Sequence, residues 1–215
     1  MKNLPLDYNK AFRALKKNYP DAQCALIHKG AFQLLIATIL SAQCTDKRVN
    51  QVTPLLFKKY PTAELMAKAR LASVEKLIHS TGFYHNKAKN IISCSQSLVK
   101  HFNKQVPDNL KDLIQLAGVG RKTANVVLGV IFNKPEGIVV DTHVKRLAFR
   151  FGWTKSNNPV IIEKQLQKVI SVKYWIILSH WLILHGRALC KARSPQCKLC
   201  FFKKECPYYS ELRQS

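Results

Sequence analysis

Apolar side chains recur along this chain of 215 residues at the three- and four-residue spacing of helices, and no segment alternates as a strand would. The clearest stripe consists of Phe32, Leu35, Ile36, Ile39 and Leu40. The fold class predicted is all-α. Within the predicted helices we expect a break or bend at Pro54, and we expect Asp108 to cap the helix that follows it. The pattern predicts helices over residues 6–19, 32–40, 47–59, 62–69, 73–79, 87–102, two within 110–132, 141–151, 161–170 and 172–189.

A glycine hairpin, LAGVG, joins the two short helices within residues 110–132. Gly118 and Gly120 allow positive φ and the close approach of another backbone. The second helix starts near Arg121 and Lys122, and its first amides lie at the positive end of the helix dipole without intrahelical partners. The hairpin therefore predicts an anion site, for which DNA phosphate is a natural ligand.

Lys122 is unusual at this position, because cations are favoured at the other end of a helix. The field of the helix end, and any desolvation, would favour the neutral amine, which is a nucleophile. The position therefore suits a lysine that forms a Schiff base. An exposed lysine that only touches phosphate is the alternative, and this stretch by itself leaves both open.

Residues 133–137 form the best linker signal and suggest two lobes with a cleft between them. Asp141 precedes the next predicted helix, where an aspartate is most often an N-cap. The helix that starts at Lys122 rises roughly 15 Å, and residues 133–140 span at most about 28 Å. The chain can therefore return Asp141 to the level of Lys122, so Asp141 could be a cap, a catalytic carboxylate or both.

The formal charge of +23, from 35 Lys and Arg against 12 Asp and Glu, indicates a polyanionic partner, most simply nucleic acid. A lysine-rich composition can also reflect the base composition of a genome, so charge supports DNA binding without proving it. The segment Met1–Pro5 leads into no apolar run, so we expect no signal peptide. The longest apolar run, residues 174–184, is too short to span a bilayer. We expect a cytoplasmic, nucleoid-associated monomer that does not enter a membrane.

Four of the seven cysteines crowd near the C-terminus with the spacing C-x6-C-x2-C-x5-C, at Cys190, Cys197, Cys200 and Cys206. A disulfide framework would be unusual in an unsecreted chain of this size, whereas four thiolates can surround one metal centre. The spacing leaves zinc and an iron–sulfur cluster both open, because it matches neither paired CxxC knuckles nor the ferredoxin patterns.

Basic residues surround this cysteine loop and could hold DNA phosphate or form a solvated face; they are Lys191, Arg193, Lys198, Lys203 and Lys204. The histidines show no ligand spacing, since even His180 and His185 are five residues apart. We expect the histidines to be surface or core residues.

Six motifs in a fixed order resemble the endonuclease III family of helix-hairpin-helix DNA glycosylases. The resemblance covers nearly the whole chain. The motifs are LSAQCTD (40–46), GFYHNKAKNI (82–91), LAGVGRKTANVV (116–127), VDTHV (140–144), LILHGR (182–187) and the cysteine loop (190–206).

The resemblance implies a central helical domain over residues 22–133, which contains the helix-hairpin-helix motif of residues 110–132. A second helical domain would combine residues 1–21 with 134–215 and carry the cluster loop. The cofactor implied is a [4Fe–4S] cluster on Cys190, Cys197, Cys200 and Cys206.

The activity implied is that of a bifunctional DNA glycosylase and AP lyase of base excision repair. Such an enzyme removes oxidised pyrimidines from duplex DNA and cleaves the abasic site by β-elimination. By resemblance, Lys122 is the amine that attacks C1′ of the sugar, and Asp141 assists it. The implied DNA contacts are Gln43, which fills the gap left by the flipped nucleotide, Phe83, which acts as a wedge, and Gly118, Val119, Gly120, Arg121, Lys191 and Arg193.

Two positions depart from the family pattern. Ala117 stands where similar hairpins usually carry proline, a change that costs roughly 0.4–1 kcal/mol through the unfolded chain. Phe83 stands where leucine is common, and the larger ring could alter tolerance of the opposite base.

Two alternatives remain. The adenine-mismatch branch of the superfamily shares the hairpin and cluster, but its members typically lack the hairpin lysine and carry an added C-terminal domain. This chain has Lys122 and ends nine residues after Cys206. The second alternative is a non-catalytic DNA-binding protein that uses the hairpin and cluster as a scaffold.

Overall fold

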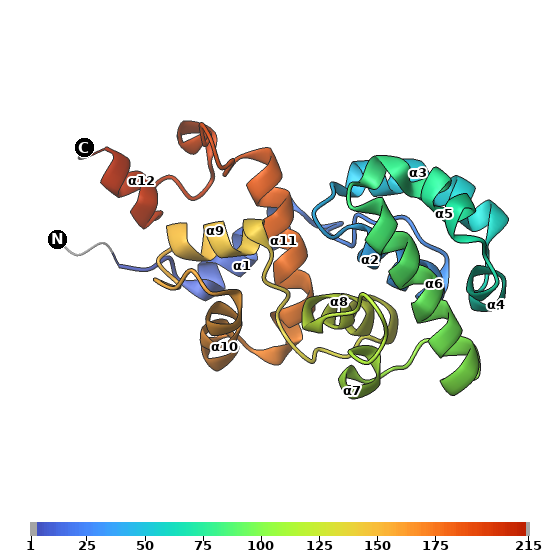
Figure 1. Cartoon of the computed structure of the whole chain (residues 1–215). Helices are drawn as coiled ribbons and strands as arrows, with labels where there is room; N and C mark the ends of the chain where they lie inside the picture. Colours follow the sequence, from blue (N-terminus) through green and yellow to red (C-terminus); the bar gives the residue numbers. More distant parts are fainter. Residues whose placement is uncertain (1–3, 214–215) are drawn as a thin grey trace. The chain divides into compact units, whose positions relative to one another are not determined.

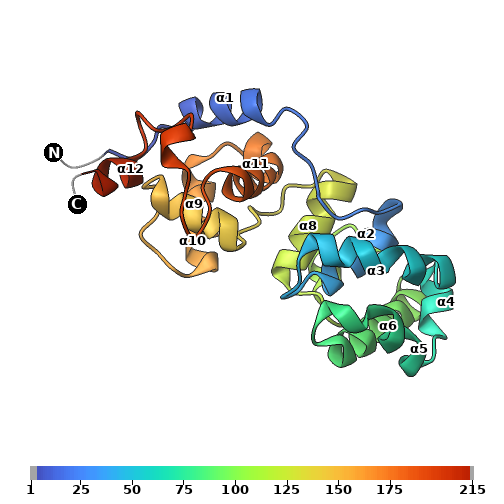
Figure 2. The same cartoon turned by 90° about the horizontal axis from the view of Figure 1, so that it is seen from above.

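In the computed structural model, which describes residues 4–213, every regular element is a helix (Figures 1 and 2), which confirms the all-α prediction. Residues 1–3, on which the leader-peptide expectation partly rests, lie outside the described residues. The chain divides into two compact units, Cys24–Glu136 and Met1–Gln23 with Gly137–Ser215. Each unit has an apolar core of its own.

The unit Cys24–Glu136 is built around α2, whose residues 34–40 are all buried. α2 packs against α3, α6 and α8, so the hairpin helix α8 rests directly on the most buried helix of the unit. The elements are α2 (Gly30–Leu40), α3 (Asp46–Lys59), α4 (Ala63–Ala67), α5 (Leu71–Ile78), the 3-10 helix η1 (His79–Thr81), α6 (Tyr84–His101), α7 (Leu110–Leu113) and α8 (Arg121–Phe132).

The second unit brings the first helix of the chain together with the C-terminal helices (Figure 2). α1 packs on α11, and the indole Nε1 of Trp181 donates to the carbonyl of Tyr19 at 3.3 Å. The elements are α1 (Tyr8–Asn18), α9 (Thr142–Arg150), α10 (Pro159–Val169), η2 (Val172–Tyr174), α11 (Trp175–Ala188), η3 (Cys197–Leu199) and α12 (Pro207–Leu212).

α9 and α11 approach each other closely at Gly186. A Cβ at this position would lie 2.7 Å from Nδ1 of His143 and 2.8 Å from Nη2 of Arg146. The glycine in LILHGR therefore allows α11 to lie against α9, the helix that Asp141 precedes.

Two local predictions are wrong. The helix does not break at Pro54: α3 continues through it, because Val52, Thr53 and Leu56 around it are buried and their packing offsets the lost hydrogen bond. The alternative, a bend at Pro54, stays a prediction. Asp108 does not cap α7: the Asn109 side chain accepts from the amide of Asp112 at 2.9 Å, and Asp108 instead pairs with Lys134. α12 was not predicted from the sequence, since a helix of six residues is too short to show a period.

Candidate functional site

Lys122 is the second residue of α8 and is exposed. Gly120 is the N-cap of this helix and offers no side-chain cap, so the first helical hydrogen bond runs from the amide of Ala124 to the carbonyl of Gly120 at 3.0 Å. Within residues 4–213 the Lys122 ammonium makes no hydrogen bond or ion pair. An exposed amine therefore stands at an open, positive helix end.

The hairpin before α8 uses its two glycines differently. Gly118 has φ +77°, and a Cβ there would lie 2.9 Å from Cβ of Asn90 and 3.1 Å from Cγ2 of Ile39. Gly120 has φ −90° and open space around it, so the expectation of positive φ is correct only for Gly118. Gly118 lets the hairpin lie against the core, and Gly120 leaves the outer backbone uncovered.

The backbone amides of the hairpin differ in whether they are already hydrogen-bonded. Val119 is 6% exposed, and its amide donates to the carbonyl of Leu116 at 3.1 Å. The amides of Gly118 and Gly120 donate no hydrogen bond to any described residue. They are the hairpin donors available to an anion, whereas Val119 anchors the turn.

Asp141 is the N-cap of α9, which confirms the structural interpretation of this residue. Its Oδ1 accepts from the amide of Val144 at 2.8 Å, and Oδ2 accepts no hydrogen bond from the part of the chain that the structure describes. One oxygen therefore holds the helix, and the other is left for a ligand. Asp141 and Lys122 belong to different units.

Gln43 and Phe83 share an uncommon backbone geometry. Both are exposed and both have positive φ, +52° and +49°. Gln43 lies between α2 and α3, and Phe83 is the N-cap residue of α6 with 66% of its surface exposed. A left-handed backbone is costly for residues with a Cβ, above all for a bulky aromatic, and such positions cluster at functional sites.

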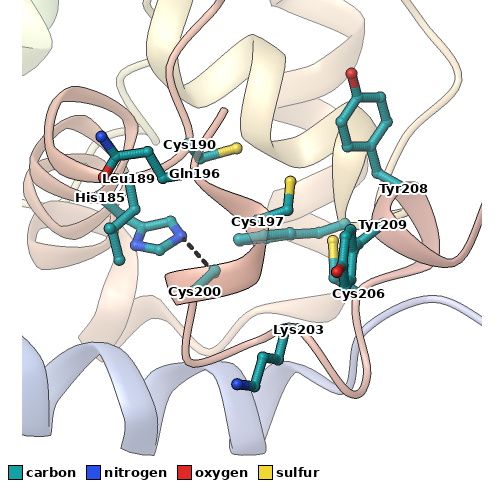
Figure 3. A pocket seen from close by; sticks show the side chains of 11 residues that line it. His185, Leu189, Cys190, Gln196, Cys197, Cys200, Lys203, Cys206, Tyr208 and Tyr209 are labelled. Atoms are coloured by element: carbon teal, nitrogen blue, oxygen red, sulfur yellow. Dashed lines mark hydrogen bonds between the residues drawn. The ribbon is translucent and has the colours of Figure 1, made fainter. Parts of the chain in front are cut away.

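The four C-terminal cysteines line one pocket (Figure 3), and none is in a disulfide. Burial raises the pKa of the Cys200 thiol to about 11, and it also raises the pKa of Cys197 and of Cys206. Two sulfurs accept hydrogen bonds: Cys200 Sγ from the amide of Phe202 at 3.4 Å, and Cys190 Sγ from Arg150 at 3.2 Å. Among the described residues, no group of three His, Cys, Asp or Glu side chains is placed to hold a metal ion.

Sequence reasoning missed two arginines that hold the cysteine loop, Arg146, which donates to the carbonyl of Cys190 at 3.1 Å, and Arg150. Arg150 is 8% exposed and donates to the carbonyl of Lys191 at 2.8 Å and to that of Ala192 at 3.2 Å, in addition to Cys190 Sγ. Its guanidinium also lies 4.4 Å from the ring centroid of Tyr208. The available signal was an arginine within the otherwise apolar stripe of α9.

His185, which lines the cysteine pocket, is a further residue whose role the sequence analysis underestimated. It is fully buried, and burial lowers its pKa to about 4, so the ring is neutral near pH 7. Its Nδ1 lies 3.1 Å from the hydroxyl of Tyr19, and its Nε2 lies 3.5 Å from Cys200 Sγ (Figure 3). The expectation of a surface or core residue was correct, but this core histidine also touches a cysteine of the loop.

The predicted basic contacts are available to solvent. Lys191 and Arg193 are exposed on the cysteine loop, as Arg121 is at the hairpin. An open pocket of about 460 Å³ in the same unit as the loop has no acidic residue in its lining, which consists of Thr142, Lys145, Arg146, Phe149, Arg150, Asn157 and Tyr208. None of the helices described over residues 4–213 has both the length and the apolar character needed to cross a membrane.

Comparisons with known proteins give a consistent result. The sequence profile of the HhH-GPD superfamily base excision DNA repair proteins matches residues 36–171. The endonuclease III of Synechocystis sp. is 51% identical over 193 residues, which cover 90% of this chain and 88% of that protein. The endonuclease III of Rickettsia prowazekii is 47% identical, with 94% of each chain covered.

Solved structures agree with these relatives. A non-covalent endonuclease III–DNA complex has a TM-score of 0.91 at 41% identity and covers 96% of this chain and 97% of that one. A trapped endonuclease III–DNA covalent intermediate has a TM-score of 0.90 at 42% identity and covers 95% of this chain and 96% of that one. A thermostable thymine-DNA glycosylase shares the fold, with a TM-score of 0.80 at 21% identity over 94% and 96% of the two chains.

Proposed function

The chain belongs to the endonuclease III family of HhH-GPD base excision DNA repair proteins, and from this premise we propose how its residues act. The protein is a DNA glycosylase with AP lyase activity. The observation that carries the proposed mechanism is Lys122, an exposed amine at the uncapped start of α8 that has no partner among residues 4–213. The substrates proposed are oxidised pyrimidines and abasic sites in double-stranded DNA.

Lys122 is proposed as the nucleophile. A base inside the duplex is out of reach, so the damaged nucleotide is first flipped out of the stack. The neutral Lys122 amine attacks C1′, and the bond between C1′ and the base breaks with its electron pair leaving on the base. The attached nitrogen then loses one of its two protons. Its lone pair forms the double bond to C1′ as the C1′–O4′ bond of the sugar ring breaks and O4′ takes up a proton, which gives a protonated Schiff base between Nζ and C1′.

Strand cleavage follows from that intermediate. The Schiff base withdraws electrons and acidifies the C2′ proton. Loss of this proton forms the C2′–C3′ double bond and expels the 3′ phosphate, which is β-elimination. Water then hydrolyses the Schiff base and frees Lys122.

Asp141 is proposed as the carboxylate that assists this chemistry through Oδ2, while Oδ1 stays on the amide of Val144. It can accept a proton from the lysine or stabilise positive charge at the sugar. The proposal requires Lys122 and Asp141, which lie in different units, to act on one nucleotide.

The proposed DNA contacts fall into two groups. The amides of Gly118 and Gly120, the start of α8 and Arg121 bind phosphate, and Lys191 and Arg193 add charge from the cysteine loop. Gln43 and Phe83 enter the duplex, Gln43 in the gap left by the flipped nucleotide and Phe83 as a wedge. Their exposure and fixed left-handed backbones support these two roles.

A [4Fe–4S] cluster is the proposed cofactor, held by Cys190, Cys197, Cys200 and Cys206. The chemistry of the donor set supports the proposal, since four thiols line one pocket and two of the sulfurs accept N–H hydrogen bonds, the usual surroundings of an iron–sulfur ligand. The described residues do not yet bring three of these thiols to metal-ligand spacing, so the proposal rests on residue type and sequence spacing. When bound, the cluster cross-links four points of the loop and so fixes Lys191 and Arg193. We further propose that the protein acts as a monomer on DNA in the cytoplasm, at the nucleoid.

The test is a duplex that carries a single thymine glycol. Base release is measured by chromatography and strand scission by denaturing gel, for wild type, Lys122→Gln and Asp141→Asn. We expect Lys122→Gln to lose both products and Asp141→Asn to slow base release by at least about 100-fold. The matched control is Lys58→Gln, at an exposed lysine of the same unit, which should leave both rates unchanged.

The same assay separates the alternatives. Release of adenine from a mismatch with no action on thymine glycol would assign the protein to the adenine-mismatch branch and contradict the proposed substrate class. Scission that persists in Lys122→Gln would contradict the proposed nucleophile. The remaining alternative, a non-catalytic scaffold, is disfavoured by the family assignment itself.

A further inference from the structure

Lys87 is a buried lysine without an acidic partner. It lies in the first turn of α6 and is 5% exposed, and burial lowers its pKa. Its Nζ donates to the carbonyl of Thr81 at 2.7 Å, and in the described part of the chain it forms no ion pair. A lysine near the N-terminal end of a helix is also disfavoured by the helix dipole. Burial here costs folding stability, so the contact it makes requires an explanation.

That contact fixes the segment that carries Phe83. The side chain of Lys87 holds the carbonyl of Thr81, and its own amide donates to the carbonyl of Phe83 at 3.1 Å. Thr81 is in turn held by its hydroxyl, which donates to the carbonyl of Ile78 at 2.8 Å. Lys87 therefore forms hydrogen bonds to the backbone on both sides of Gly82, through its side chain to Thr81 and through its amide to Phe83.

The two residues held in this way, Gly82 and Phe83, have strained backbone angles. Gly82 has φ +68° and Phe83 has φ +49°, so two successive residues adopt left-handed backbone. For phenylalanine this conformation is unfavourable by itself and persists only when neighbouring contacts determine it. The Lys87 side chain is such a contact, because its removal frees the Thr81 carbonyl, which begins the turn.

We propose that Lys87 is a positioning residue, which holds the Phe83 turn in the conformation that drives nucleotide flipping. The inference rests on the function proposed for Phe83 and deepens it. Lys87 touches neither DNA nor the reacting atoms, and its effect passes through the backbone of Thr81 to Phe83. It sets how readily the damaged nucleotide leaves the stack, and it does not alter the bond chemistry at Lys122.

Flipping and chemistry separate when two substrates are compared. A damaged base must be unstacked before it can be cleaved, whereas an abasic nucleotide has no base to unstack and flips at less cost. A residue that acts on flipping therefore affects the base lesion more than the abasic site. A residue that only supports the fold lowers both rates together, or lowers stability alone.

The experiment measures single-turnover rates of Lys87→Met on duplexes with a thymine glycol or with a preformed abasic site, together with thermal unfolding. We expect the rate on thymine glycol to fall by about 10-fold and the rate on the abasic site by less than about 2-fold. Lys87→Arg, which keeps a donor for Thr81, should recover most of the loss. Lys89→Met, at an exposed lysine of the same helix, is the matched control and should change neither rate.

A double-mutant cycle with Phe83→Ala tests the route of the effect. If Lys87 acts through Phe83, Lys87→Met adds little to Phe83→Ala on the thymine glycol substrate. Equal losses on both substrates, or full additivity with Phe83→Ala, would overturn the proposal for Lys87 and leave that for Phe83 intact. If Phe83→Ala alone changes neither rate, the proposed role of Phe83 fails and the inference about Lys87 fails with it.

Discussion

The hairpin of residues 116–120 and the cysteine loop of residues 190–206 are both proposed to meet DNA phosphate, but the segments that would contact it, the hairpin and residues 191–194 of the loop, are held differently. The hairpin is fixed by apolar packing: Leu116 and Val119 are buried, and Gly118 fits against Asn90 and Ile39. Residues 191–194 of the loop are all exposed. The loop is held by hydrogen bonds from Arg146 and Arg150 to its carbonyls, and Phe202, which is 2% exposed, anchors its far end in the core. Apolar packing can therefore preform the phosphate site of the hairpin, whereas the exposed segment 191–194 depends on hydrogen bonds from arginines to its backbone.

This difference predicts where each region is fragile. A steric change beneath the hairpin should damage the fold of its unit, because the hairpin belongs to the core. A change at a cross-link should damage the loop and leave the rest of the molecule folded. The predictions below follow this contrast, from the largest expected effect to the smallest.

The largest effect is expected for Gly118→Ala. The variant forces an alanine to φ +77° and places its Cβ 2.9 Å from Cβ of Asn90, so we expect the free energy of unfolding to fall by about 2–4 kcal/mol. Urea denaturation measures this loss. Gly120→Ala is the control, since its φ is negative and no atom lies within 4 Å of the added Cβ. Equal losses in the two variants would contradict the packing account of the hairpin.

The next effect concerns the cross-link at Arg150. Arg150→Met removes the hydrogen bonds to the carbonyls of Lys191 and Ala192 and to Cys190 Sγ. We expect the free energy of unfolding to fall by about 2–3 kcal/mol. The visible absorption of the bound cluster should also decay faster in the presence of an iron chelator. In Arg193→Met, at an exposed arginine of the same loop, the visible absorption should decay at the wild-type rate. Identical decay in all three proteins would show that Arg150 does not hold the loop.

A smaller effect is expected from the exposed cations of the loop. If wild type neutralises about six phosphates, log K should fall with log salt at a slope near −5. Lys191→Ala and Arg193→Ala should each reduce that slope by about 1 and leave the urea midpoint unchanged. A slope that stays the same in both variants would place the DNA contacts of this unit elsewhere.

The smallest effect is a difference in thiol reactivity. Cys94 is fully buried, and burial raises its pKa to about 12, so it should resist alkylation at pH 8 until the protein unfolds. The four loop cysteines should resist alkylation while the proposed cluster is bound and should react after chelation of the iron, with Cys200 the slowest of the four because burial raises its pKa to about 11. Peptide mapping of the alkylated sites measures both, and early modification of Cys94 would contradict the packing of this core.

The sequence predicted most of the fold for an identifiable reason. Amphipathic stretches such as α1, α6 and α9 carry a helical period that their apolar residues set by themselves. Features that depend on neighbours distant in the chain were not predictable: α3 tolerates Pro54 only through its burial, and Arg150 is recognisable as a loop support only once the loop lies beside it.

The candidate site, like the fold, contains features that the sequence predicts and features that only the structure shows. The chemistry of Lys122, Asp141 and the four cysteines was predictable from residue type, spacing and resemblance, although their roles remain proposals. The different uses of Gly118 and Gly120, and the buried amine of Lys87 beneath the Phe83 turn, were not predictable. They depend on backbone angles and on contacts that the sequence pattern does not encode.

The central claim is that Lys122, at the uncapped start of α8, forms a covalent Schiff base with DNA. Borohydride reduction during reaction with a thymine glycol duplex, followed by mass spectrometry of the adducted peptide, tests it most directly. The account predicts a stable protein–DNA adduct on Lys122 in wild type and no adduct in Lys122→Ala. An adduct on another residue, or one that persists in Lys122→Ala, would contradict it.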